Sequence, residues 1–170
     1  MIGLGVEARK QRGLPGGVIR LIYVAAHALR EGQSGVSIAK DAGRSANLAK
    51  ILDFAGDGTC IHVKPKELLL GPGAPEEEAD KFVETLGRWN GTVVGHPLQH
   101  CAWQEIPVSY IHTLNDLGLP LHYQKAMVEH IKSTGRDVQT FELDSGHCPT
   151  VTMPKELATL VEQIIDNSNA

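Results

Sequence analysis

The chain has 170 residues, and 16 Lys and Arg against 20 Asp and Glu give it a formal net charge of −4. A chain of this length predicts one domain, and its apolar fraction of 42% excludes a disordered polar chain. The mild acidity argues against nucleic-acid binding, which requires a basic face. The longest apolar run, Val18 to Leu29, is short and contains Arg20 and His27, so no membrane span is expected. The first residues also lack the basic start of a signal peptide.

The three cysteines form no Cys-x-x-Cys pair, which excludes the common zinc and redox motifs. Sparse free thiols suit a reducing compartment, so a cytoplasmic location is predicted. The eight histidines include no His-x3-His pair. His96 and His100 with Cys101 suggest a metal site at first sight, but a second ligand pair is missing. Neither a metal nor an organic cofactor is therefore expected.

In chain order, the first predicted elements are a short helix over Leu4–Arg12 and a strand over Val18–Ala25. The strand is almost continuously apolar and β-branched, which is typical of a parallel strand buried on both faces. Glycines and charged residues from 31 to 44 break this pattern. In the variable stretch that follows, helices are predicted over Ala46–Phe54, from Pro65, and from Pro75 to about Trp89.

The last third of the chain is more regular. It predicts a strand over Pro107–His112, a helix over Pro120–Ser133, a strand over Val138–Leu143, a loop over Asp144–Thr152, and an amphipathic helix from Pro154 to about Asp166. Strands that alternate with helices at this spacing indicate an α/β fold with a short parallel sheet.

Two loops in this last third carry residues suited to acid–base chemistry. Asp116 follows one predicted strand and His147 follows the next. Because ligand sites of parallel sheets lie beyond the carboxyl ends of the strands, we expect the two side chains at one edge. A carboxylate there can orient an imidazole that acts as general base and acid. The alternatives are that Asp116 caps a turn and that His147 is satisfied by backbone groups.

Several stretches resemble the α/β-hydrolase superfamily. They are residues 17–29, Ile106–Asp116, Pro120-x-x-x-Gln124, Ser145–Pro149 and Pro154-x-x-Leu157. The likeness is to small esterase-like members, including those of filamentous fungi and the plant methylesterase and hydroxynitrile lyase group. It covers essentially residues 1–170 and implies a partial, single hydrolase domain. Residues from about 31 to 104 would be its mostly helical cap, and the chain would be its C-terminal part.

The resemblance implies that Asp116 is the acid and His147 the base of a Ser-His-Asp site. The nucleophilic serine is missing, because none of the serines lies in Gly-x-Ser-x-Gly. We therefore expect a hydrolase without roughly its first third, in which Val18–Ala25 is left as an exposed sheet edge. Such a chain is either the incomplete product of a longer gene or pairs along this edge with a partner chain or a second copy of itself.

For the full-length relative, the resemblance implies hydrolysis of a small ester, lactone or thioester, within secondary metabolism. His27, Phe82 and Trp89 are candidate substrate-binding residues, although His27 also suits the edge of the core. Two alternatives stay open for this chain. It is either a hydrolase-like binding protein without catalysis, or a lyase, isomerase or cyclase in which His147 and Asp116 work without a serine.

Overall fold

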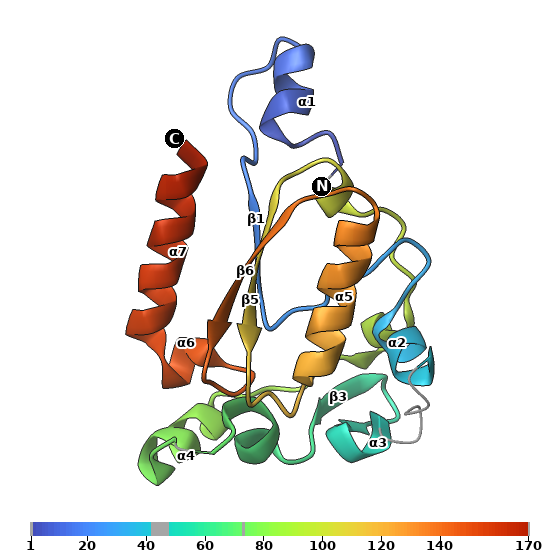
Figure 1. Ribbon diagram of the computed structural model, residues 1–170. Helices are drawn as coiled ribbons and strands as arrows, with labels where there is room; N and C mark the ends of the chain where they lie inside the picture. Colours follow the sequence, from blue (N-terminus) through green and yellow to red (C-terminus); the bar gives the residue numbers. More distant parts are fainter. Residues whose placement is uncertain (1, 42–47, 73, 170) are drawn as a thin grey trace.

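The main sheet of the computed structural model, which describes residues 2–41, 48–72 and 74–169, is short and parallel. Its strands are β1 (Leu21–Val24), β5 (Val108–Thr113) and β6 (Val138–Leu143), in the order β1-β5-β6 (Figure 1). The register sets Leu21 opposite Val108 and Val108 opposite Val138. This arrangement confirms the α/β class expected from the sequence.

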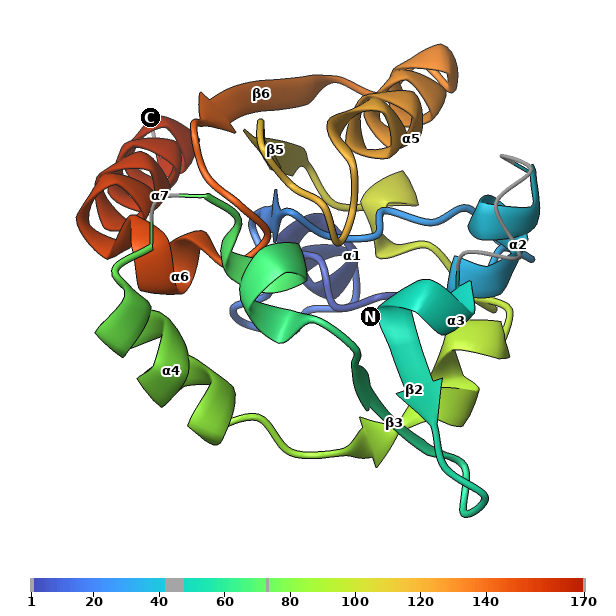
Figure 2. The same ribbon diagram turned by 90° about the horizontal axis from the view of Figure 1, so that it is seen from below.

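The sheet is covered on both faces by helices that follow its strands. Helix α5 (Leu121–Ser133) packs with the larger apolar cluster on one face, and α7 (Pro154–Asn169) packs with the smaller cluster on the other (Figures 1 and 2). All residues of the central strand β5 are buried. No helix within the described residues is long and apolar enough to cross a membrane.

Strand β1 forms one edge of the sheet. The backbone N–H groups of Leu21 and Ala25 donate to Pro107 O and Ile111 O of the neighbouring strand segment, at 2.8 and 3.2 Å. Because alternate residues of a strand point to opposite sides, the N–H group of Val24 faces away from β5. In the described part of the chain, β1 pairs with β5 alone, and residues 22–24 are half-buried where burial on both faces was expected.

Residues 31–104, which we call the insert, connect β1 with β5 and lie largely beyond the carboxyl ends of the strands (Figure 1). Its elements are α2 (Gly35–Asp41), α3 (Leu48–Ile51), β2 (Leu52–Phe54), β3 (Thr59–His62), the short π-helix η2 (Lys66–Leu70), α4 (Glu76–Glu84), β4 (Trp89–Asn90), and the 3-10 turns η3 (Gly91–Gly95) and η4 (Ala102–Gln104). In addition to the expected helices, β2, β3 and β4 form a small antiparallel sheet.

Some predicted boundaries differ from the observed ones. The helix expected over Ala46–Phe54 begins in residues that lie outside the described ranges, and its second half is α3 followed by β2. Helix α1 covers Val6–Gln11, close to the expectation. The short helix α6 (Pro149–Thr152) was expected as part of a loop, and α2 lies in a stretch for which no element was predicted.

His112, near the end of β5, is a buried histidine from which we expect a pH dependence of the fold's stability. His112 is only 3% exposed, and its ring centroid lies 4.7 Å from that of Tyr110. Its Nδ1 has no hydrogen-bond partner among the described residues. Burial, followed by the positive charge of Lys125, lowers the pKa of His112, although Glu142 and Gln124 act in the opposite direction. The imidazole is therefore more difficult to protonate in the folded chain than in the unfolded chain.

We expect the contribution of neutral His112 to the free energy of unfolding to be fully present above the unfolded histidine pKa of about 6.5. It should be lost as the pH falls from there toward the lower pKa of the folded chain. Urea unfolding at pH 7.5 and at successively lower pH measures this loss, which for one proton is at most about 1.4 kcal/mol per pH unit. The variant His112→Phe keeps an aromatic ring but cannot titrate, so its pH dependence should be smaller. An unchanged pH dependence in this variant would contradict the assignment to His112.

Candidate active site

Asp116 and His147 meet at the carboxyl edge of the main sheet. Asp116 lies in the loop after β5 and His147 in the loop after β6, and these strands are parallel neighbours. The distance from His147 Nδ1 to Asp116 Oδ2 is 2.8 Å. The Asp116 side chain is fully buried, whereas that of His147 keeps 29% of its surface exposed. The structure thus brings together the two residues that the sequence placed at one edge.

The carboxylate of Asp116 accepts hydrogen bonds on both oxygens. Leu119 N–H donates to Oδ1 at 2.6 Å, and the Thr113 hydroxyl donates to Oδ2 at 2.9 Å. Gln124 Nε2 also lies 3.2 Å from Oδ2, the oxygen that contacts His147. Since a carboxylate surrounded by donors only accepts, Nδ1 of His147 carries the proton and Nε2 is left as the basic nitrogen.

The loop that bears His147 is packed tightly against η2 of the insert. Cys148 N–H donates to Leu69 O at 2.8 Å. A Cβ atom on Gly146 would lie 2.5 Å from the carbonyl carbon of Leu70, closer than real side chains approach. The absence of a side chain at Gly146 therefore allows η2 to rest on the backbone next to His147.

Gly118 packs closely against the imidazole ring of His147. A Cβ atom there would lie 3.2 Å from Cγ of His147 and 3.3 Å from Leu68 O. A side chain at this position would therefore require the ring of His147 or the insert to shift by a few tenths of an ångström. Glycine at 118 and 146 thus allows the loops that bear Asp116 and His147 to lie close to each other and to η2.

Two further histidines lie within electrostatic reach of His147. Burial, and then the charge of His147, lowers the pKa of His62 on β3. The same two causes lower the pKa of His27, and Asp116 partly opposes them. By its accessible surface, however, His27 is an exposed residue, so it is close to this pair and also open to solvent. Trp89 lies beside His62, with 6.4 Å between ring centroids.

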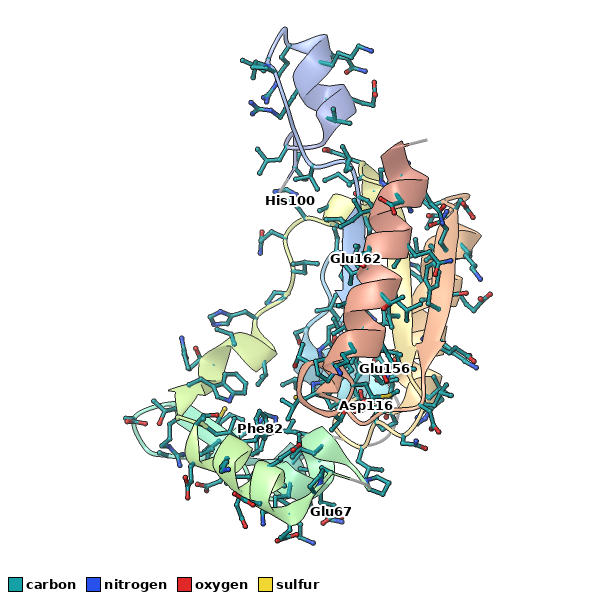
Figure 3. All side chains as sticks on the ribbon, turned by 90° about the vertical axis from the view of Figure 1, so that its left-hand side faces the viewer. Glu67, Phe82, His100, Asp116, Glu156 and Glu162 are labelled. Atoms are coloured by element: carbon teal, nitrogen blue, oxygen red, sulfur yellow. The ribbon has the colours of Figure 1, made fainter. Side chains whose placement is uncertain are left out.

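The three predicted substrate-binding residues differ in how closely the structure connects them with Asp116 and His147. The charges of both Asp116 and His147 affect the pKa of His27. Trp89 contacts His62, whose pKa is affected by His147. Phe82 is half-buried on α4, at the same end of the molecule as Asp116 (Figure 3). Within the described residues, no three His, Cys, Asp or Glu side chains form a group that could hold a metal ion.

A separate hollow of about 360 Å³ lies between α2 and α5. It is lined by Ala28, Arg30, Gln33, Ile38, Asp41, His122, Tyr123, Ala126, Met127 and His130. Neither member of the Asp116–His147 pair borders it. We assign the candidate site to the pair, because there a buried charge, an oriented imidazole and the carboxyl edge of the sheet coincide.

Sequence reasoning assigned no role to Gln124 and missed His62. A signal for Gln124 exists, because it is the polar member of the buried stripe of α5 that also contains Met127, Val128 and Ile131. A fully buried glutamine on an apolar stripe indicates a specific hydrogen-bonded partner. His62 offers no comparable signal, since its strand is short and shows no clear alternation.

No family model matches the chain. Two curated proteins are similar to it in sequence. "Probable hydrolase R7" of a Phoma species is 30% identical over 80 residues, which cover 46% of this chain and 33% of that protein. Alpha/beta hydrolase nvfD of Aspergillus novofumigatus is 27% identical over 147 residues, or 86% of this chain and 56% of that protein. The chain thus spans about a third to a half of these relatives.

Solved structures of hydrolases share the fold. A pyrethroid hydrolase from Sphingobium faniae superposes with a TM-score of 0.65 at 23% identity, over 97% of this chain and 65% of that one. Polyneuridine aldehyde esterase gives a TM-score of 0.68 at 14% identity, over 96% of this chain and 66% of that one. The chain thus has the α/β-hydrolase fold, of which it contains the C-terminal part.

Proposed function

We propose that this chain supplies the acid and the base of a Ser-His-Asp site that hydrolyses a small carboxylic ester, lactone or thioester. The observation that carries the proposal is the 2.8 Å contact between His147 Nδ1 and the buried carboxylate of Asp116, at the carboxyl edge of two parallel strands. The names of the similar structures, a pyrethroid hydrolase and an esterase, favour this class of substrate.

In this mechanism a serine hydroxyl attacks the substrate carbonyl while His147 Nε2 takes its proton. Asp116 holds the ring in the required tautomer and stabilises the imidazolium that forms. His147 then protonates the leaving alcohol or thiol, and water releases the acyl group by the reverse path. The open side of β1 suits the strand that carries the serine, because that strand would then end at the same edge as Asp116 and His147.

A fluorophosphonate probe tests this proposal on the native protein, because it reacts only with an activated serine. We expect one labelled serine, which peptide mapping places in a Gly-x-Ser-x-Gly turn, and the intact mass shows whether that turn belongs to the same polypeptide. The variant His147→Ala should abolish labelling. His100→Ala is the matched control, since His100 is exposed and lies well away from Asp116 (Figure 3). Absence of labelling in the native protein, or labelling that survives in His147→Ala, would refute the proposal.

A further inference from the structure

We infer that Gln124 and Thr113 are positioning residues, which together fix the Asp116 carboxylate in the direction of His147. The inference rests on the proposed function and deepens it, because it names what holds the acid of the site. Gln124 and Thr113 are both completely buried. Neither can touch a substrate directly, and both contact the Asp116 carboxylate, which is the route by which they can act on the site.

The orientation of the Gln124 amide is set by its surroundings. Its Oε1 accepts a hydrogen bond from Thr113 N–H at 3.1 Å. Its Nε2 faces only oxygen atoms: Leu119 O at 2.7 Å, Thr113 Oγ1 at 3.0 Å, Asp116 Oδ2 at 3.2 Å and Thr113 O at 3.3 Å. A flipped amide would oppose an N–H group with its own NH2 and set its oxygen among acceptors. The amide nitrogen is therefore locked as the donor.

This lock also determines where the Thr113 hydroxyl points. Because Thr113 Oγ1 accepts from Gln124, the one proton of the hydroxyl is free to donate elsewhere. Its partner is Asp116 Oδ2 at 2.9 Å. Gln124 thus acts twice on the carboxylate, directly through Nε2 and indirectly by directing the hydroxyl of Thr113.

The consequence is that the carboxylate cannot turn without losing hydrogen bonds. Thr113 and Gln124 hold Oδ2, and the N–H group of Leu119 holds Oδ1 at 2.6 Å. Oδ2 is the atom that receives Nδ1–H of His147. The whole network is buried, and a buried network of this kind is rigid only when every member is satisfied. Removal of either donor should let the carboxylate move relative to the imidazole.

The test compares Gln124→Met, which keeps the length of the side chain without its donor, with Thr113→Val, which keeps the shape without the hydroxyl. Thr113→Ser restores the hydroxyl and should restore the native behaviour. Met127→Leu, on the same buried stripe of α5, is the control for packing alone. All variants are made in the native protein, and Thr113→Val keeps the test valid if Gln124→Met does not fold.

The first readout is the proton NMR signal of His147 Nδ1–H, assigned by its loss in His147→Ala. We expect this signal to weaken by faster exchange with water, or to shift, in Gln124→Met and Thr113→Val, and to persist in Thr113→Ser and Met127→Leu. The second readout is ester hydrolysis, where kcat should fall up to about 10²-fold with little change in KM.

The outcomes separate this inference from the proposed function. Reduced stability with an unchanged Nδ1–H signal in Gln124→Met and Thr113→Val would overturn the positioning role and leave both residues purely structural. If the signal changes as expected while neither native protein nor variants hydrolyse esters, the positioning of His147 stands and the proposed function fails.

Discussion

Replacement of Asp116 by asparagine should lower kcat/KM for an activated ester about 10⁴-fold in the native protein. Both carboxylate oxygens of Asp116 accept hydrogen bonds, and an amide offers only one acceptor. If its NH2 group faces His147, Nδ1 has to accept, so the ring proton moves to Nε2. The imidazole is then in the wrong tautomer and cannot take a proton from the nucleophile.

Steady-state hydrolysis of p-nitrophenyl acetate measures this loss, together with thermal unfolding to show that the variant is folded. Asp144→Asn is the matched control, because Asp144 is an exposed carboxylate in the loop that bears His147. Its activity should stay within about threefold of the parent, as for most surface changes. Retention of more than a tenth of the parent activity by Asp116→Asn would show that Asp116 does not orient the base.

The second large effect is expected from Gly146→Ala. A methyl group at this position would meet the carbonyl group of Leu70, with its carbon at 2.5 Å and the Gly71 nitrogen at 3.0 Å. These are backbone atoms, which cannot swing aside as a flexible side chain can. Either η2 or the loop bearing His147 has to move, and we expect a loss of about 3 kcal/mol in the free energy of unfolding.

Urea unfolding measures this loss, with Gly87→Ala as the control. Gly87 lies in the insert, and a Cβ atom there would meet nothing within 4 Å. Its substitution should change the free energy of unfolding by no more than about 0.5 kcal/mol. A cost below about 1 kcal/mol for Gly146→Ala would mean that the contact between η2 and the loop is loose.

The last third of the chain could be predicted closely because its elements carry strong local signals. β6 occupies the expected residues Val138–Leu143, and α5 and α7 begin within one residue of the prolines that marked their starts. The pairing of Asp116 with His147 followed from strand order alone. Local pattern and tertiary structure agree in this part of the chain.

The insert could not be predicted to the same degree. Its strands are two to four residues long, too short for an apolar alternation to emerge, and their pairing is decided by contacts distant in sequence. The roles of Gly118 and Gly146 could not be predicted either. They depend on η2, whose approach to these loops no local pattern encodes.

The position of the insert in the chain also bears on the order of folding. β5 and β6 are joined through α5 alone, whereas β1 and β5 are sheet neighbours separated by the entire insert. Contacts between residues distant in sequence form slowly, because the entropy of closing the intervening loop is lost before the contact contributes. The β5–α5–β6 unit is thus suited to form early as a template of low contact order. On this ground β1 is expected to pair with β5 only after β5 and β6 have paired with each other.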